Sequence, residues 1–374
     1  MNNKFGFIVH PIDRRTFYAC IEPLNLLKFF CSENIIDNLA IKMPPRYLGA
    51  YKNIRSAREI IVGGDIVAMP ILPSQMLNIG EERTVSLIEK CVKYCEKKGD
   101  KIVGLGGFAS VIGNEGEVVS KRVSIPVTSG NTLTASLILD GIYKAAYLMG
   151  LNLSDSIVSI IGATGDIGSI CAKILSKKVR KLNIAARNEK KLQDFANILV
   201  KYGNAKIEVF KYIKDAIQKA DIILTAASSI SAIIDPLLLK PGAILCDVAM
   251  PANIAKEIAI SRDDILVFEG GLAKIPYPKD ISNTKMSSAM NINGVYGCLA
   301  ETITLTFECR FEPFSIGRGN ITEEKLAEIK KMATNNGISV SDFFCGYKMF
   351  SERDIDNIRK NAERNKQRAY VAQR

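Results

Sequence analysis

The sequence predicts an α/β protein built on a doubly wound parallel sheet, with a further α/β region before that sheet and helices after it. Two observations carry this prediction. A run of β-branched residues over 157–161 stops at a glycine turn and passes into a helical pattern. Short apolar segments then alternate with helical ones as far as residue 268, which is the pattern of a parallel sheet covered on both faces.

Three glycines follow the first of these strands at intervals of three residues. Glycine lets a backbone approach a pyrophosphate closely, and the free N–H groups at the start of the next helix favour its negative charge. We therefore interpret the turn as the phosphate-binding part of a Rossmann-type sheet. A plain strand-to-helix turn is the alternative. The predicted contacts are Gly162, Ala163, Thr164, Gly165, Asp166, Ile167 and Gly168.

The next strand, over 181–186, predicts which dinucleotide is bound. It ends in Ala186, Arg187 and Asn188, at roughly 20 residues from the glycines, where a protein that binds NAD places an acidic residue for the ribose hydroxyls. An arginine suits a 2′-phosphate instead, so we expect NADPH. The alternative is that Arg187 only solvates the end of a strand.

Further strands are predicted over 207–210, 221–225, 243–248 and 265–268. Residues at the carboxyl ends of such strands line the cofactor crevice. We therefore expect contacts on the nicotinamide side from Ala227, Ser228, Gly270 and Gly271, together with residues 249–251.

The chain before the glycine turn predicts a second α/β region. The expected elements are a strand over 4–9, a helical segment over 17–30, a hairpin or two short strands around Gly63 and Gly64, an amphipathic helix over 82–98, a strand over 102–105 and a helix over 133–149. His10 ends the first strand, either as a proton donor or as a hydrogen-bonded structural residue. The strand 102–105 runs into Gly106 and Gly107, a glycine pair that permits close approach of a ligand or another backbone.

A polar stretch over 128–132 precedes the helix that begins near residue 133. Thr128, Ser129, Asn131 and Thr132 suit a capped helix start. They equally suit a helix N-terminus that faces the substrate or the nicotinamide, and we keep both interpretations.

Length and charge set further bounds. The 374 residues suggest two domains or one large elaborated domain, and we place boundaries at 1–132, 133–284 and 285–374. The last segment should hold helices over 293–307 and 322–335. The formal charge of +11 suggests an anionic partner. Basic residues are dispersed except in 351–374, for which we predict a solvated helix.

Cysteine usage and apolar patterning suggest a cytoplasmic protein. Nine cysteines without a signal peptide favour a reducing compartment and free thiols. The sequence has one histidine and no Cys-x-x-Cys pair, so we expect no metal site. No apolar run reaches the ~20 residues that a membrane span requires.

With these pieces in place, the chain resembles the long-chain acyl-acyl-carrier-protein reductases, which form fatty aldehydes. The resemblance covers roughly residues 4–337. The matching segments are 5–10 (FGFIVH), 105–110 (LGGFAS), 128–135 (TSGNTLTA), 162–169 (GATGDIGS), 186–188 (ARN), 298–301 (CLAE) and 317–322 (GRGNIT). The Gly-Gly-Phe, Ser-Gly-Asn-Thr and Cys-x-Ala-Glu segments are more particular than the glycine turn.

The resemblance implies that Cys298 is the nucleophile in an NADPH-dependent reduction of a long-chain acyl thioester. A thiolate is a good nucleophile and leaving group, and a helix N-terminus lowers a thiol pKa, so a helix start near Cys298 would help it. His10, Lys274 and Lys285 are other possible sources of positive charge. We expect substrate contacts at Gly106, Gly107, Phe108, Ser129, Asn131, Thr132 and Arg318.

The acyl donor is expected to be an acidic acyl carrier protein or a coenzyme A thioester, since a basic surface attracts either. We expect no nucleic acid partner and leave open a peripheral membrane contact. The segment before Cys298 is shorter than in the family, Cys309 replaces an expected glycine, and the tail is longer and basic. Two alternatives remain: a carbonyl reductase resembling shikimate dehydrogenase, and a non-catalytic NADPH-binding sensor.

Overall fold

The protein divides into two compact units. The structure, a computed structural model, describes residues 3–21, 26–227, 234–248, 258–277, 294–346 and 348–372. Unit 1 comprises Met1–Thr134, Ala273–Asn320 and Lys325–Ser339, and unit 2 comprises Ala135–Leu272, Ile321–Glu324 and Val340–Arg374. The first crossing lies two residues from the predicted boundary at 132/133. The predicted third segment, 285–374, is shared between the two units because its helices pack on both.

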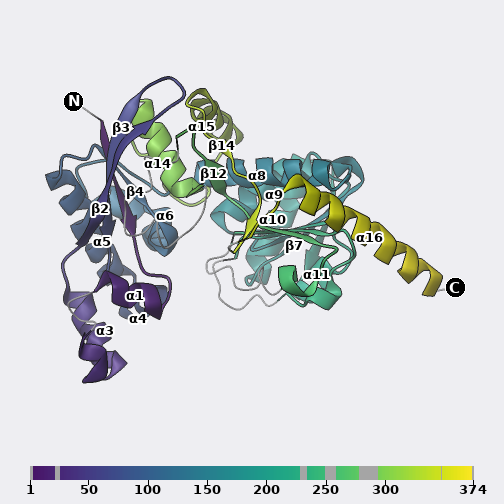
Figure 1. Cartoon of the computed structure of the whole chain (residues 1–374), viewed down its shortest axis with the longest axis horizontal. Coiled ribbons are helices and arrows are strands. Elements are labelled where there is room, and N and C mark those ends of the chain that lie inside the picture. The colour runs from purple at the N-terminus through teal and green to yellow at the C-terminus, as the bar shows by residue number, and fades with distance from the viewer. Residues whose placement is uncertain are drawn as a thin grey trace. The chain divides into compact units, whose positions relative to one another are not determined.

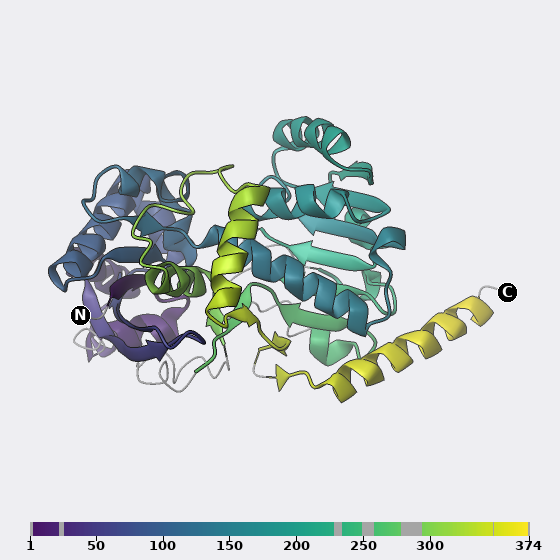
Figure 2. The same cartoon turned by 90° about the horizontal axis from the view of Figure 1, so that it is seen from above.

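Unit 2 contains a six-stranded parallel sheet (Figures 1 and 2). Its strands are β6 (Ile157–Ile161), β7 (Lys181–Ala185), β8 (Lys206–Phe210), β9 (Ile222–Thr225), β10 (Ile244–Asp247) and β11 (Leu266–Glu269). The order β11-β10-β9-β6-β7-β8 means that the chain steps outward from β6, returns to β9 beside it and steps outward the other way. This is the doubly wound Rossmann-type order, and it confirms the predicted fold class.

Helices cover both faces of this sheet. They are α8 (Asn131–Leu148), α9 (Asp166–Ser176), α10 (Glu189–Tyr202) and α11 (Ile213–Ile217). α9 and α10 pack against each other and against β7, and α11 covers the other face (Figure 1). Short 3-10 turns lie at η3 (Leu153–Asp155) and η4 (Pro236–Leu238). Five of the strands are almost wholly buried, which is why they read as mostly apolar runs, whereas the edge strand β8 is partly exposed.

Unit 1 is built on a five-stranded mixed sheet of order β2-β3-β1-β4-β5. The strands are β1 (Lys4–Val9), β2 (Arg46–Arg55), β3 (Ile61–Ala68), β4 (Ile102–Leu105) and β5 (Val127–Thr128). β1 is parallel to β3 and β4, and β2 runs antiparallel to β3 at the edge. The carboxyl ends of β1, β4 and β5 therefore point to one edge of the sheet, where the segments after Val9, Leu105 and Thr128 begin.

The predicted hairpin around Gly63 and Gly64 is wrong. β3 runs straight through both glycines and pairs with β1, with Gly64 opposite Phe5. A Cβ on Gly64 would lie only 2.5 Å from the Phe5 ring atom Cε1. The glycine therefore makes room for a buried aromatic ring and does not form a turn. The strand that pairs with β3 as a hairpin partner is β2, which the sequence pattern did not reveal.

The helices of unit 1 follow the predicted pattern more closely. They are α1 (Arg14–Cys20), α3 (Glu33–Lys42), α4 (Pro73–Ile79), α5 (Glu81–Lys97), α6 (Ile112–Glu115), α7 (Glu117–Ser120), α14 (Gly297–Phe307) and α15 (Glu323–Asn335), with 3-10 turns η1 (Leu26–Phe29) and η2 (Gly107–Ser110). The predicted amphipathic helix is α5, which buries Val85, Ile88 and Val92. The predicted helical segment 17–30 is divided into α1 and η1, and residues 22–25 lie outside the described ranges. α14 packs against β1, β3 and β4.

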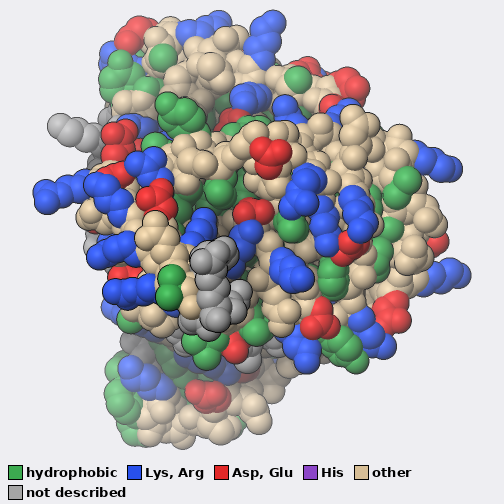
Figure 3. Space-filling view, turned by 90° about the vertical axis from the view of Figure 1, so that its right-hand side faces the viewer, with side chains coloured by type: hydrophobic (Ala, Val, Ile, Leu, Met, Phe, Trp, Pro, Cys, Tyr) green, Lys and Arg blue, Asp and Glu red, His purple; other side chains and the backbone are tan. Residues whose placement is uncertain are grey.

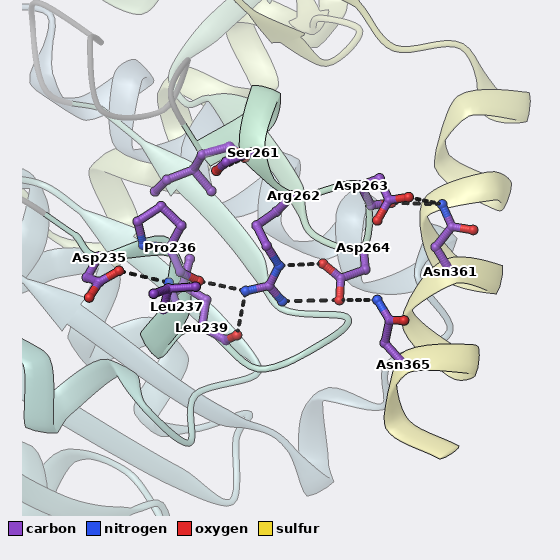
Figure 4. A network of polar contacts seen from close by, with 11 residues as sticks. Asp235, Pro236, Leu237, Leu239, Ser261, Arg262, Asp263, Asp264, Asn361 and Asn365 are labelled. Carbon is purple, nitrogen blue, oxygen red and sulfur yellow. Dashed lines mark hydrogen bonds and ion pairs between the residues drawn. The ribbon is translucent and has the colours of Figure 1, made fainter. Parts of the chain in front are cut away.

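The predicted solvated helix at the end of the chain is α16 (Glu352–Ala372), which belongs to unit 2. Figure 4 shows how its side chains are held. Asn361 Nδ2 donates to Asp263 Oδ2 over 3.0 Å and Asn365 Nδ2 donates to Asp264 Oδ2 over 2.9 Å. Arg262 fixes Asp264 from the other side through Nε, over 2.7 Å. Asn361 and Asn365 thus anchor the middle of the helix, and residues from Lys366 to Arg368 are exposed.

Charges and thiols are distributed as expected. Figure 3 shows Lys and Arg side chains spread among Asp and Glu over the face that it draws, without a single basic patch. All nine cysteines lie in the described ranges and have free thiols. Within those ranges, every helix is too short or too polar to cross a membrane. The remaining short strands are β12 (Leu272–Lys274), β13 (Val295–Tyr296), β14 (Ser339–Val340), β15 (Phe344–Cys345) and β16 (Lys348–Met349).

Candidate active site

Cys298 lies at the start of α14 in unit 1. It is the second residue of the helix, after the N-cap Tyr296, and its side chain is half-buried. This confirms the expected position near a helix start, although α14 begins at Gly297 and not at the predicted residue 293, which lies outside the described ranges. The first N–H groups of a helix have no partner within it, so they favour a negative charge on a nearby atom.

Three backbone N–H groups near the Cys298 thiol favour its ionised form and so lower its pKa. They belong to Gly107, to Leu299 and to Cys298 itself. Burial nevertheless raises the pKa of Cys298 to about 11, with the three N–H groups acting in the opposite direction and the nearby Glu301 adding to the rise. The resting thiol is therefore neutral at pH 7. The same N–H groups are placed to stabilise a thiolate once it forms.

Gly130 fixes the position of Cys298 by direct backbone packing. A Cβ on Gly130 would lie 2.5 Å from Cys298 Cβ and would overlap the Cys298 Cα, and Gly130 has φ +77°. Both the space and the backbone conformation therefore require glycine. The sequence pattern offered Gly130 only as part of a polar stretch, and its contact with the nucleophile was not predicted.

His10 holds the loop that carries Gly107. Its Nε2 accepts a hydrogen bond from the backbone N–H of Phe108 over 2.7 Å, and its Nδ1 lies 2.9 Å from the carbonyl oxygen of Pro11. Since a carbonyl only accepts, Nδ1 carries the proton and Nε2 is the acceptor. Burial lowers the pKa of His10, which favours this neutral form. Both ring nitrogens are occupied, so of the two interpretations the structure supports the hydrogen-bonded structural residue.

Glu301 is a buried carboxylate one turn after Cys298. Its Oε1 accepts from the Thr128 hydroxyl over 2.5 Å, and its Oε2 accepts from the backbone N–H of Leu133 and the Ser315 hydroxyl, each over 2.9 Å. It thereby joins α14 to the end of β5, to the first turn of α8 and to the loop after α14. Burial raises the pKa of Glu301, and these donors act in the opposite direction. The acidic residue of the Cys-x-Ala-Glu segment is thus bound in the interior of unit 1.

Two of the predicted substrate residues make internal hydrogen bonds. Ser129 donates through its backbone N–H and its hydroxyl to the carbonyl oxygen of Ser315, over 3.1 and 2.5 Å. Thr132 donates its backbone N–H to the Ser315 hydroxyl over 3.1 Å. The polar helix start therefore anchors the loop around Ser315, close to Gly130 in the chain.

Arg318 and Asn131 meet at a second buried carboxylate, Glu115. Arg318 Nη2 donates to Glu115 Oε1 over 2.8 Å, and Asn131 Nδ2 donates to Glu115 Oε2 over 3.4 Å. The Arg318 side chain is half exposed, whereas Glu115 is buried and has φ +56°. Of the remaining predicted contacts, Gly106 donates its N–H to Ile8, Gly107 is exposed beside the thiol, and Phe108 is half-buried.

The glycine turn in unit 2 has the geometry that phosphate binding requires. A Cβ on Gly162 would lie 2.8 Å from the backbone of Ala226 and Ala227, so the turn passes directly over the end of β9. Gly165 is the N-cap of α9 and makes no side-chain cap hydrogen bond, and a helix N-terminus of this kind favours a phosphate. A Cβ on Gly168 would be 3.0 Å from the carbonyl carbon of Gly162. Ala163, Thr164, Asp166 and Ile167 belong to the same turn and helix start.

The end of β7 carries the residues predicted to select the cofactor. Arg187 is exposed and forms no ion pair with any residue in the described ranges. Asn188 caps α10 by accepting from the backbone N–H of Lys191 over 2.9 Å, and Ala186 precedes the pair. Gly270 and Gly271 follow β11, where a Cβ on Gly270 would lie 2.5 Å from Cys246 Sγ. Ser228, Lys285 and residues 249–251 lie outside the described ranges, and Lys274 is exposed on β12.

Comparison with known proteins shows similarity to a dehydrogenase family and to two curated proteins. Residues 144–268, which lie within unit 2, match the family model for shikimate/quinate 5-dehydrogenase. The chain is 29% identical over 297 residues to a long-chain acyl-acyl-carrier-protein reductase from Synechococcus elongatus, covering 76% of this chain and 84% of that protein. It is 28% identical over 343 residues to the aminotransferase PigE from a Serratia species, covering 90% of this chain but only 39% of PigE.

Among solved structures, quinate dehydrogenase from Corynebacterium glutamicum in complex with NAD has a TM-score of 0.38 and 12% identity, over 89% of this chain and 99% of that one. The sheet order, the glycine turn and the family match agree on the fold of unit 2. It is a Rossmann-type unit of the kind that binds NAD(P), and residues 144–268 are similar to the shikimate/quinate 5-dehydrogenase family.

We predict that His10→Phe slows the alkylation of Cys298. Phenylalanine removes the acceptor for the Phe108 N–H, so the Gly107 N–H loses its support and the thiol pKa rises. A lost hydrogen bond corresponds to about a fivefold lower rate at fixed pH. The measurement is iodoacetamide labelling of Cys298 followed by peptide mass spectrometry. His10→Gln is the control, because its amide oxygen keeps an acceptor; equal rates in all three proteins would contradict the role of His10.

We predict a steep pH dependence for the same labelling in a variant without Cys20, Cys31 and Cys309, the half-buried and exposed thiols besides Cys298. Only the thiolate reacts, and the pKa of Cys298 is about 11. The rate should therefore rise about tenfold per pH unit between about pH 7 and 10. A plateau beginning below about pH 8 would show that the thiolate is already formed at neutral pH, against this expectation.

Proposed function

We propose that the protein reduces a long-chain fatty acyl thioester to the fatty aldehyde with NADPH, through an acyl-enzyme on Cys298. The observation that carries the proposal is a half-buried thiol at a helix N-terminus, packed against Gly130 and close to backbone N–H groups that favour its thiolate. A redox reaction of hydroxyl and carbonyl groups alone needs no such nucleophile. The likeness to the Synechococcus elongatus reductase supports the choice of an acyl thioester.

The proposed reaction has two steps. The Cys298 thiolate attacks the carbonyl carbon of the incoming thioester, and the donor thiol leaves with a proton. NADPH held at the turn of Gly162, Gly165 and Gly168 would be the source of a hydride for the carbonyl carbon of the acyl-cysteine, and a proton on the oxygen would complete a hemithioacetal. Breaking the carbon–sulfur bond releases the aldehyde and restores the thiol. The cofactor is oxidised to NADP⁺ and the acyl group is reduced by two electrons.

The residues around Cys298 have distinct parts in this scheme. The N–H groups of Gly107 and Leu299 stabilise negative charge on sulfur, and they cost no reorganisation because the backbone already holds them in place. His10 positions Gly107 through the Phe108 N–H. Glu301 positions the first turns of α14 and the loops around it. The backbone of Gly130 packs directly against Cys298 and so fixes its position.

The acyl donor is proposed to be either an acidic acyl carrier protein or a coenzyme A thioester. Both carry negative charge, and the protein has a net charge of +11. The half-exposed Arg318 is a candidate contact for a phosphate of either donor, since its guanidinium is held at one edge by Glu115.

A second candidate is a carbonyl reductase that resembles shikimate dehydrogenase. The family match to residues 144–268 favours it, because that match lies wholly in the cofactor unit and concerns a dehydrogenase without a named thioester. It differs from the main proposal in one requirement. A carbonyl reductase transfers hydride directly and does not depend on Cys298.

We predict that palmitoyl-coenzyme A or palmitoyl carrier protein, without NADPH, adds one palmitoyl group to the protein. Intact-protein mass spectrometry should show the adduct on wild type and on Cys309→Ser, which lacks an exposed thiol, but not on Cys298→Ala. Addition of NADPH should then remove the adduct and release palmitaldehyde. Full turnover by Cys298→Ala would overturn the acyl-enzyme and favour the carbonyl reductase, and no adduct or aldehyde from either donor would leave the cofactor-binding sensor.

We predict that Arg187→Ala raises the KM for NADPH about tenfold or more and leaves the KM for NADH unchanged. A charge-assisted hydrogen bond to a phosphate is worth ~1.5–3 kcal/mol, and only NADPH carries the 2′-phosphate. Steady-state kinetics with each cofactor make the comparison. Lys201→Ala, near the other end of α10, is the control. An unchanged preference in Arg187→Ala would refute cofactor selection by this residue.

A further inference from the structure

Unit 1 exposes a group of large apolar side chains on η1, on α3 and on the short link between them. Their exposed fractions are 71% for Leu26, 71% for Phe29, 84% for Phe30, 51% for Ile35 and 40% for Leu39. We call these five residues the apolar patch. Single exposed apolar residues are common on proteins, but a contiguous group marks a surface that binds something.

The two phenylalanines make this patch unusual within the chain. The sequence has 15 phenylalanines, all within the described ranges, and only Phe29 and Phe30 are exposed. The other exposed large apolar residues, such as Leu237, Ile260 and Tyr147, lie in other elements of the chain. The patch thus collects the most apolar exposed rings at one place.

The exposure follows from how this part of the chain folds. α3 turns Ile36 and Ala40 inward, where they join Phe17, Ile21 and Leu72 in a small core. Ile35 and Leu39 stand one position earlier and face outward. Arg14 of α1 forms ion pairs with Asp37 and Glu33 of α3, which fix the two helices to each other. The patch is therefore the outer face of a segment whose inner face is already packed.

The shape and charge around the patch favour a lipid surface as its partner. α3 lies at one end of unit 1, beyond α1 and α4 and away from strands β1 and β4 (Figure 1). Side chains that stand out from such an end fit a deformable bilayer without needing a matching groove. Lys28 lies with its Nζ 5.0 Å from the Phe29 ring centre, so an ammonium group accompanies the rings. A membrane-surface anchor typically places aromatic rings at the edge of the acyl region and basic side chains at the lipid phosphates.

We propose that the apolar patch docks the protein on an anionic lipid bilayer. Leu26, Phe29 and Phe30 would enter the boundary between headgroups and acyl chains, and Lys28 would contact the phosphates. The net charge of +11 would draw the protein to a negative surface before these side chains insert. The inference does not depend on the proposed reaction, because binding requires no turnover.

The test is co-sedimentation of the full chain with vesicles of phosphatidylcholine and phosphatidylglycerol in equal parts, and with vesicles of phosphatidylcholine alone. We expect wild type to bind the mixed vesicles and to bind the neutral ones more weakly. F29S/F30S should lose more than about tenfold of the binding, since two phenyl rings no longer leave water. L237S/I260S removes two equally exposed apolar side chains from unit 2 and should bind as wild type does. Matching circular dichroism melting curves would confirm that the variants are folded.

Three results would overturn the proposal. Wild type could fail to bind either kind of vesicle. F29S/F30S could bind as tightly as wild type, which would place the lipid contact elsewhere. Analytical ultracentrifugation could show that wild type is a dimer and F29S/F30S a monomer, which would assign the patch to a second copy of the chain. The variant K28E separates the electrostatic contribution to binding from the apolar one. It should weaken binding to the mixed vesicles without affecting binding to the neutral ones.

Discussion

The arrangement of unit 1 around its reactive thiol depends on one buried carboxylate. Glu301 accepts hydrogen bonds from Thr128, Leu133 and Ser315, which come from a strand end, a helix start and a loop. A buried carboxylate is tolerated only when such donors replace water, and each donor in turn becomes fixed. Thr128 and Leu133 flank Gly130 in the sequence, and Glu301 itself lies in the first turns of α14. These hydrogen bonds therefore hold Gly130 against the start of α14. Glu301 thus sets the frame, although it makes no contact with sulfur that the structure describes.

The thiol itself lies where two opposing effects meet. Burial favours its neutral form, and the surrounding N–H groups favour the charged one. The balance keeps the sulfur protonated when nothing is bound, so oxidants and adventitious electrophiles find little thiolate. The donors become useful at the moment when charge develops on the sulfur or on an attached carbonyl. The thiol is selective because its negative charge appears only during the reaction. It is reactive because the backbone N–H groups are already in place to stabilise that charge.

Local patterns predicted the elements that depend on short stretches of chain. The spacing of Gly162, Gly165 and Gly168 predicted the turn, and the alternation of strands predicted the doubly wound sheet, because both follow from neighbouring residues. The spacing of apolar residues likewise predicted α5. Gly64 was misinterpreted as a turn, since its role is to make room for Phe5, a residue 59 positions earlier.

The candidate site was predicted only in part for a related reason. A resemblance identified Cys298, and the helix pattern placed it near a start. The roles of His10 and Glu301 arise from partners about 100 to 170 residues away in sequence, and no local pattern encodes such pairs. Gly130 was visible only as part of a polar stretch. The roles of His10, Glu301 and Gly130 can be recognised only when the folded structure brings their distant partners together.

The donors around Cys298 belong to the main chain, and this has a consequence for how such a site changes over time. A side chain near the sulfur can be replaced without removing a donor as long as the path of the backbone is kept, and Gly107, Gly130 and the contact of His10 with Phe108 keep it. The residues that specify the site are therefore those that fix the backbone, and two of them, Gly107 and Gly130, have no side chain. A search for related sites that compares reactive side chains would overlook this one, whereas a search that compares the path of the backbone would find it.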